Sequence, residues 1–179
     1  MQTEVMGRLE NLLGAQALAL SDRLDAAGSE AMGRSASECA ALVTLLAHPD
    51  ESVSWLGGVL RLTSSGITRL VDRLVDAGWV TRTAGVDARS RRIRLTRPGR
   101  NRANAVLDAR HAAMADALGA LSASDRGELE RLLGVLVGRL AQTRLPALQV
   151  CRLCDRTVCA SEGRECPLKH TVPVGDTDD

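Results

Sequence analysis

The sequence contains no phenylalanine and no tyrosine, and only two tryptophans, Trp55 and Trp79. Yet 45% of its 179 residues are hydrophobic, so a buried core is expected. Such a core must consist mainly of Leu, Val and Ala side chains that pack between helices. The composition therefore predicts a mostly α protein, either one domain or one domain with a small appendage.

Long apolar runs are also missing. No run of roughly 18 apolar residues occurs, and the N-terminus lacks the basic and then apolar segments of a signal peptide. We therefore expect no association with a membrane, and a cytoplasmic, reducing location.

Residues suited to catalysis are scarce and scattered. The three histidines, His48, His111 and His170, lie far apart in the sequence, and we find neither a nucleophile motif nor a glycine-rich loop for phosphate. An enzyme is therefore not expected.

The net charge of +1 conceals an uneven distribution of charge. Residues 1–60 carry a net charge of −5 and residues 103–179 a net charge of −2, whereas residues 61–102 hold eleven Arg against three Asp, a net charge of +8. A local basic patch attracts phosphates and releases their counterions on binding. It favours a nucleic-acid partner over a merely solvated basic face.

Helical periodicity and capping signals predict six helices, over residues 3–27, 36–48, 52–62, 64–77, 97–119 and 123–145. Capping boxes at Ser35 and Ser122 open two of them, and Thr63 or Ser64 caps the fourth. Two short alternating runs, residues 79–83 and 92–96, predict a two-stranded hairpin. Leu145-Pro146 is expected to end the last helix, and the sequence from Cys151 onward shows no helical period.

A short amphipathic helix followed by a strand, an arginine-rich tip and a second strand is typical of a winged helix-turn-helix. Its helix enters the major groove of DNA and its wing enters the minor groove. The chain also resembles the MarR family of bacterial transcriptional regulators, through the segments Ser64–Arg82, Asp87–Arg89 and Leu95–Gly99. The resemblance implies an obligate homodimer, held by the first helix and the last two, that represses genes from a near-palindromic operator in double-stranded DNA.

We therefore expect a mostly α fold with a small β-hairpin wing and three regions. These are a helical dimerisation region at residues 3–30 and 97–145, a winged helix-turn-helix at residues 35–96, and a Cys-rich tail at residues 146–179. Members of the family often bind small aromatic molecules between the dimer helices and the winged part. A small-molecule effector is expected on that resemblance, but the sequence identifies no pocket or ligand for it.

The first set of predicted DNA contacts lies on the helix that begins near Ser64. Small hydroxyl side chains at a helix N-terminus let the backbone approach a duplex, and Gly66 lets the helix lie close in the groove. Arginines one turn apart suit bidentate contact with guanine or a phosphate clamp. The predicted contacts of this helix are Ser64, Ser65, Gly66, Thr68, Arg69 and Arg73. For Arg73, an ion pair with Asp72 or Asp76 is the alternative.

The second set of predicted contacts lies on the wing. Arg89 is placed at its tip, where a projecting guanidinium suits a narrow, electronegative minor groove. The family resemblance implies that Asp87 braces the hairpin beside it. Arg91, Arg92 and Arg94 are predicted to contact the DNA backbone.

Four cysteines follow the last predicted helix with the spacing C-x2-C-x4-C-x6-C: Cys151, Cys154, Cys159 and Cys166. In a chain without a secretory signal, this density of thiols favours a metal over disulfides. One tetrahedral zinc ion per chain is the first expectation, with a structural or a sensing role. An iron–sulfur cluster, a thiol–disulfide switch and unliganded thiols remain open, as does His170 as a substitute ligand or a surface residue.

The fifth cysteine, Cys39, shares a helix face with Leu42, Val43 and Leu46. This position predicts a buried core thiol. A peroxide-sensing thiol is the alternative, but no basic residue lies next to Cys39 in sequence to lower its pKa.

Two other functions compete with this interpretation. An ArsR-type metal-sensing repressor has a cysteine motif similar to Cys151–Asp155, but in that family the motif lies inside the helix-turn-helix. A metal-binding interaction module would contact protein and not DNA, which the basic patch disfavours. A salt-dependent gel shift separates the module from a DNA-binding protein.

Overall fold

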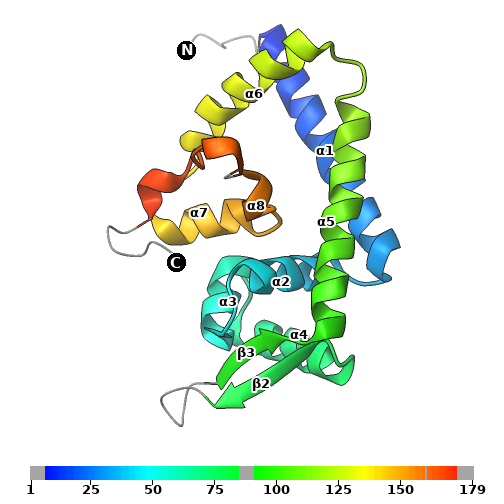
Figure 1. Ribbon diagram of the computed structural model, residues 1–179, viewed down its shortest axis with the longest axis vertical. Helices are drawn as coiled ribbons and strands as arrows, with labels where there is room; N and C mark the ends of the chain where they lie inside the picture. Colours follow the sequence, from blue (N-terminus) through cyan, green and yellow to red (C-terminus); the bar gives the residue numbers. More distant parts are fainter. Residues whose placement is uncertain (1–6, 85–90, 160, 173–179) are drawn as a thin grey trace, which may run out of the picture.

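The computed structural model describes residues 7–84, 91–159 and 161–172 (Figure 1). Its main elements, in chain order, are α1 (Arg8–Met32), α2 (Ala36–Ala47), β1 (Glu51–Ser52), α3 (Val53–Leu60), α4 (Ser64–Asp76), β2 (Val80–Ala84), β3 (Arg91–Leu95), α5 (Arg97–Ala117), α6 (Ala123–Gly138) and α7 (Arg144–Cys151). A short helix α8 (Arg156–Cys159) and two 3₁₀ turns, Ser161–Gly163 and Lys169–Thr171, follow. The predicted mostly α fold with a small β wing is confirmed.

Figure 1 shows two lobes joined by α5. The lower lobe holds α2, α3, α4 and the small sheet, while α1 runs beside the upper part of α5 and α6 descends from the upper end. The segment from α7 to α8 then returns to lie next to α2 and α3. The C-terminal part of the chain is therefore in contact with the winged lobe.

Hydroxyl side chains open the helices where the sequence predicted them. Ser35 and Ser122 each form a complete capping box, and Thr63 caps α4 by accepting a hydrogen bond from the Gly66 amide at 3.2 Å. Thr96 caps α5 in the same way. Each cap satisfies an amide that has no partner inside its helix, which fixes where the helix begins.

The sheet has three antiparallel strands in the order β1-β3-β2, so the prediction of a two-stranded hairpin was incomplete. Ile93 of β3 lies opposite Glu51 of β1 and Arg82 of β2. Ile93 and Leu95 face the core, as the alternating pattern requires. A strand of two residues has no period of its own, and only its pairing with β3 defines it.

The first helix continues past its predicted end. Gly28 was expected to end it, but α1 runs to Met32 and ends at Gly33, whose φ of 62° is left-handed. Gly28 lies against Cys39, and its carbonyl oxygen accepts a hydrogen bond from the Cys39 thiol at 3.5 Å. A methyl group at Gly28 would make ordinary van der Waals contact with the Cys39 sulfur at 3.5 Å, so this glycine lies in the helix without ending it.

The single long helix predicted up to Leu145 was wrong. The helix α6 ends at Gly138, and a separate helix, α7, begins at Arg144 with Pro146 in its first turn. A proline is tolerated there because the amide it lacks would have no helical partner. Short helices also occur beyond Cys151, where no helical period was visible.

Two cores of unequal size hold the chain together. The larger one joins α2, α3, α4, the sheet and the start of α5, and Leu153 from the C-terminal part packs against it. The smaller one contains Ala141, Ala147 and Leu168. No residue of α6 is buried, and both α1 and α6 expose several leucines. Within the described residues, no helix is both long and apolar enough to span a membrane.

Candidate DNA interface and cysteine cluster

The helix α4 separates a buried face from an exposed one. Ile67, Leu70 and Leu74 pack into the larger core. On the opposite side, the front of the helix exposes four of the predicted contacts, Ser64, Ser65, Thr68 and Arg69, and the half-buried Gly66 lies between them. The sequence therefore places small and basic side chains where a duplex could reach them.

Arg73 lies on this helix but is bound to another element. Its Nε donates a hydrogen bond to the Glu38 carboxylate of α2 at 3.0 Å, so its partner is neither Asp72 nor Asp76. Half of the Arg73 side chain is still exposed, and contact with DNA stays a prediction. Glu38 also completes the capping box with Ser35, which the sequence predicted, but no local pattern indicates a partner 35 residues away.

The electrostatics of Glu38 follow from this position. Burial alone would raise its pKa, but hydrogen bonds from Arg73 and from Ser35 outweigh it and hold the pKa of Glu38 below its ordinary value. A lowered carboxyl pKa stabilises the fold above the pKa of the unfolded chain. That stabilisation is lost as the pH falls through the lower pKa of the folded chain.

The replacement Glu38→Gln is expected to destabilise the protein by about 1–2 kcal/mol at neutral pH, because it removes a charged hydrogen bond and leaves the capping geometry. The deficit should shrink as the pH falls below the ordinary pKa of glutamate and disappear below the lowered pKa of folded Glu38, where the wild type has also lost its charge. Urea unfolding at a series of pH values measures this. As a control, Glu128→Gln breaks an ion pair with Arg131 on the surface of α6 and should leave stability unchanged. A deficit independent of pH would contradict the argument.

The arginines at the base of the wing have structural partners. Arg94 forms an ion pair with Asp50, and Arg92 donates to the Asp50 carbonyl oxygen at 2.8 Å. The Arg94 guanidinium lowers the pKa of Asp50. Arg82 likewise pairs with Asp72 and so joins β2 to α4. These pairs position the wing, and DNA contact by Arg92 and Arg94 stays a prediction.

A hollow of about 770 Å³ lies between α3, α4 and the wing. Ser64 and Thr68 from α4 and the exposed Arg91 from β3 all line it. Three predicted DNA contacts from two elements thus share one surface. The other two wing predictions, Asp87 and Arg89, lie outside the described residues.

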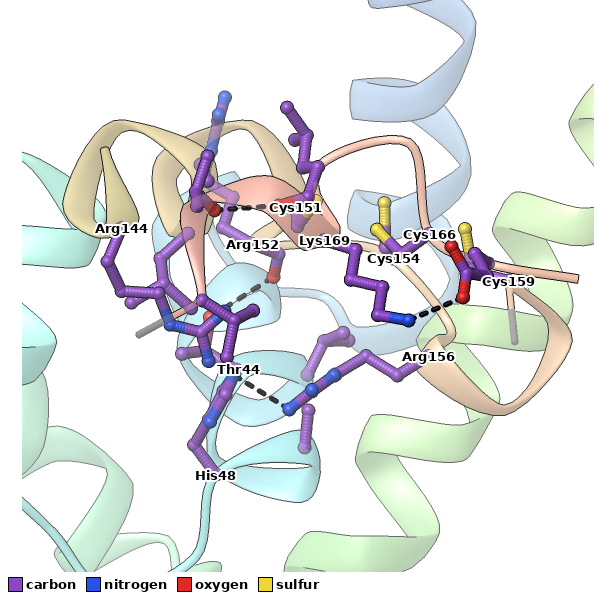
Figure 2. Close-up of a pocket in the computed structure, with 18 of the residues that line it drawn as sticks. Thr44, His48, Arg144, Cys151, Arg152, Cys154, Arg156, Cys159, Cys166 and Lys169 are labelled. Atoms are coloured by element: carbon purple, nitrogen blue, oxygen red, sulfur yellow. Dashed lines mark hydrogen bonds and ion pairs between the residues drawn. The ribbon is translucent and has the colours of Figure 1, made fainter. Parts of the chain in front are cut away.

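The four C-terminal cysteines, all present as thiols, line one cavity of about 340 Å³ (Figure 2). The cavity lies between α2, α7 and the segments that follow, and apolar side chains such as Val43 and Leu148 form part of its wall. Its cationic side chains are Arg144, Arg152, Arg156, Arg164 and Lys169. The tertiary structure therefore gathers the thiols in a basic setting.

Within this cavity the thiols interact in two pairs. The Cys151 thiol donates a hydrogen bond to the Cys154 sulfur, which raises the pKa of Cys151 and lowers the pKa of Cys154 to about 6. Burial raises the pKa of Cys159, and the neighbouring Cys166 raises it further. The positive charge of Arg110 acts on both Cys154 and Cys159.

The described residues contain no group of three or more His, Cys, Asp or Glu side chains arranged to hold a metal ion. The four thiols are thus gathered but not preformed as a ligand set. His170 contacts the Ala141 carbonyl oxygen at 3.0 Å. Cys39 is buried, and burial raises its pKa, as expected for a core thiol.

A recognition helix with an exposed basic front, packed against a braced three-stranded wing, defines a DNA-binding protein of the winged helix-turn-helix class. Comparisons with known proteins agree. The MarR family model matches residues 32–90. A MarR family protein from Bacillus stearothermophilus is 30% identical, with a TM-score of 0.62 over 74% of this chain and 96% of that one.

Two further solved structures are similar. The YusO protein from Bacillus subtilis shares the fold at 22% identity, with a TM-score of 0.64 over 73% of this chain and 93% of that one. The Mycobacterium tuberculosis MarR family protein Rv2887, solved in complex with salicylic acid, is 28% identical, with a TM-score of 0.58 over 75% of this chain and 99% of that one. No curated protein sequence matches the chain.

The chain belongs to the MarR family. It is a DNA-binding transcriptional regulator and not an enzyme. The ArsR-type alternative and the alternative of an interaction module without DNA binding are therefore set aside.

Proposed function

We propose that this protein is a homodimeric repressor that binds a near-palindromic operator through α4 and the wing. The observation that carries the proposal is the shared surface of Ser64, Thr68 and Arg91 beside the exposed Arg69. Hydroxyl groups and helix amides suit phosphate, and arginine suits guanine or phosphate. Two such surfaces, related by a twofold axis, would read half-sites about one DNA turn apart.

Selection from a pool of random duplexes tests this proposal. The bound sequences should converge on an inverted repeat, and fluorescence anisotropy should then show an affinity that falls steeply with salt. Arg91→Ala should lower the slope of that salt dependence by about one phosphate contact without changing the selected sequence. Selection of no common sequence would count against a specific operator. A reporter gene placed behind the selected duplex would show whether binding represses transcription.

The dimer part of the proposal rests on the exposed leucines of α1 and α6. On α6, Leu132, Leu133 and Leu136 are each 44–49% exposed, and Leu9 and Leu18 of α1 are exposed by 70% or more. A monomer in water would leave this apolar surface uncovered. A second copy of the chain is the partner that the family fold implies.

Replacing Leu136 by glutamate should convert the dimer into a monomer, since the charge would lose its hydration inside the interface. Light scattering coupled to size exclusion gives the mass directly. The matched control is Val158→Glu on α8, which is 61% exposed and lies outside the proposed interface, and it should remain a dimer. A Leu136→Glu protein with the mass of the wild type would exclude α6 from the interface.

We also propose that the four cysteines form a thiolate site for one zinc ion per chain or, in its place, an iron–sulfur cluster. Their convergence on one cavity supports the proposal, because its lining carries five cationic side chains against one carboxylate, Glu165, and this excess of positive charge offsets a tetrathiolate site. A thiol–disulfide switch between the paired thiols is the competing interpretation. Elemental analysis and an absorption spectrum of protein purified without oxygen distinguish the three.

A small-molecule effector is a third element of the proposal. Rv2887 has been solved with salicylic acid, an anionic aromatic molecule. An aromatic acid of this class is therefore the first probe for this chain, and the measurement is the operator affinity with and without salicylate. Unchanged affinity would remove this class from consideration.

A further inference from the structure

The C-terminal segment is attached to the helix-turn-helix by specific hydrogen bonds. Gln149 of α7 donates from Nε2 to the Gly58 carbonyl oxygen of α3 at 3.0 Å, and its Oε1 accepts from Arg61 Nε at 2.8 Å. Thr44 of α2 donates to the Arg152 carbonyl oxygen at 3.1 Å. These bonds link the start of the cysteine segment to the two helices that precede the recognition helix.

The helix α3 contacts both α7 and α4. At two of these contacts, one with each helix, the residue of α3 is a glycine. A methyl group at Gly57 would lie 3.2 Å from Ile67 of α4, and one at Gly58 would lie 3.6 Å from Leu145 of α7. Adjacent glycines thus bring the recognition helix and α7 onto two neighbouring faces of α3, about 100° apart around its axis. A displacement of α7 acts on α3, and α3 packs tightly on α4.

Arg61 occupies the turn between α3 and α4 in a left-handed conformation, with a φ of 56°. For a residue other than glycine this conformation costs about 1–2 kcal/mol. The side chain of Arg61 donates the hydrogen bond that Gln149 accepts. The tail therefore contacts the turn at a strained position, two residues before the Thr63 cap of the recognition helix.

The cysteines lie in the same segment as these contacts. Leu153, between Cys151 and Cys154, packs against the larger core, and the Arg152 carbonyl beside it is the one that Thr44 binds. Cys159 and Cys166 line the same cavity, and Figure 2 shows both on the side where Cys154 lies. Because the thiols are not preformed as ligands, closing all four around one centre must move at least one side of this segment.

A buried polar group lies at a neighbouring hollow between α1, α2 and α5, which Leu153 of the cysteine segment also lines. The Nε atom of Arg110 on α5 is buried, and it has no hydrogen-bond partner within the described residues. A buried guanidinium nitrogen without a partner is costly unless a negative group faces it. A tetrathiolate centre in the cysteine cavity would supply negative charge near Arg110, whose charge already acts on Cys154 and Cys159.

We propose that a thiophilic metal bound by Cys151, Cys154, Cys159 and Cys166 regulates DNA binding by shifting α7 against α3 and the Arg61 turn. This rests on the cysteine site of the proposed function. The metal binds the arrangement in which all four thiols surround one centre more tightly than the arrangement in which they are apart. This difference in affinity biases the position of α7. The same difference appears as a change in operator affinity.

The test uses the full-length protein purified without oxygen. Metal-free protein is loaded with Zn²⁺ alone, or with Fe²⁺ and sulfide, and metal content is measured beside the affinity for the selected duplex. The wild type should bind one zinc or one cluster per chain, with a change in Kd of about tenfold. Uptake of zinc without formation of an iron chromophore identifies a zinc site. An iron chromophore without uptake of zinc identifies an iron–sulfur cluster.

Two variants isolate the coupling from the metal site. Gln149→Ala and Thr44→Val remove the tail's hydrogen bonds but no cysteine, so each should bind metal with the wild-type stoichiometry while the change in Kd falls below about threefold. Gln142→Ala makes the same chemical change as Gln149→Ala at an exposed position just before α7 and should behave as the wild type. The Gln149→Ala and Thr44→Val proteins both keeping the full change would overturn the route through α7.

The remaining outcomes separate this inference from the proposed function. A wild type that binds the duplex but takes up neither metal overturns the metal site and leaves the DNA-binding proposal intact. Equal Kd values with and without metal overturn the regulation alone. Failure of every form to bind any selected duplex overturns the proposed operator binding itself.

Discussion

The replacement Gly99→Ala should destabilise the protein by about 3–5 kcal/mol, the sum of overpacking and of a broken buried hydrogen bond. Gly99 lies in the first turn of α5, against the chain between α4 and β2. An added methyl group would lie 1.9 Å from the Trp79 carbonyl oxygen and 2.9 Å from its carbonyl carbon. Backbone atoms cannot rotate away, so α5 would have to move.

That movement would also break the bond from the Thr96 amide to the Trp79 carbonyl, which measures 3.0 Å. Urea unfolding followed by tryptophan fluorescence measures the loss. The matched control is Gly127→Ala in α6, where no other group lies within 4 Å of the added methyl. That control should be about 0.5–1 kcal/mol more stable, because alanine favours a helix over glycine. A loss below about 1 kcal/mol at Gly99 would mean that α5 yields easily, contrary to the packing argument.

The second large effect concerns DNA affinity. Arg89→Ala should weaken operator binding about 10- to 100-fold, the usual range for losing one well-placed guanidinium contact. Arg89 is predicted from the sequence to lie at the wing tip, and the reason for the loss is that a narrow minor groove concentrates negative potential, which attracts a guanidinium. Fluorescence anisotropy with the selected duplex at fixed salt measures the change.

Arg139→Ala is the charge-matched control for this measurement. Arg139 is exposed at the end of α6, outside the basic segment, and its removal alters net charge equally. Its effect on affinity should be small, since distant exposed charges are screened by salt. An Arg89→Ala protein that binds as tightly as the wild type would refute the assignment of the wing tip.

Much of the winged lobe could be predicted because its signals are local. Thr63, Ser35 and Thr96 begin their helices by satisfying amides within three residues, and Gly78 ends α4 with a φ of 71°. Ile67, Leu70 and Leu74 recur in the sequence with the period of a helix that has one apolar face, and these are the side chains that pack into the larger core. Because the helix is amphipathic, the predicted DNA contacts lie on its opposite, exposed face.

Other features depend on partners that are distant in sequence. The strand β1 exists only through its pairing with Ile93 and Arg92, and Glu38 meets Arg73 only after α2 packs on α4. The wing arginines were predicted from charge alone, yet Arg92 and Arg94 are bound to Asp50 across the sheet. Local spacing carries no information on such contacts, because they form only when whole elements pack together.

The sequence by itself determined the family, the helix caps and the position of the basic segment that is predicted to contact DNA. It also showed four closely spaced cysteines, Cys151, Cys154, Cys159 and Cys166. Only the tertiary structure decided where those cysteines lie. They line a basic cavity against α2. They also belong to the segment in which Gln149 accepts a hydrogen bond from Arg61, in the turn of the helix-turn-helix. The physical reason is that caps and periodicity act within one or two helical turns, whereas the docking of α7 depends on close packing at Gly58 and on hydrogen bonds between residues about 90 positions apart.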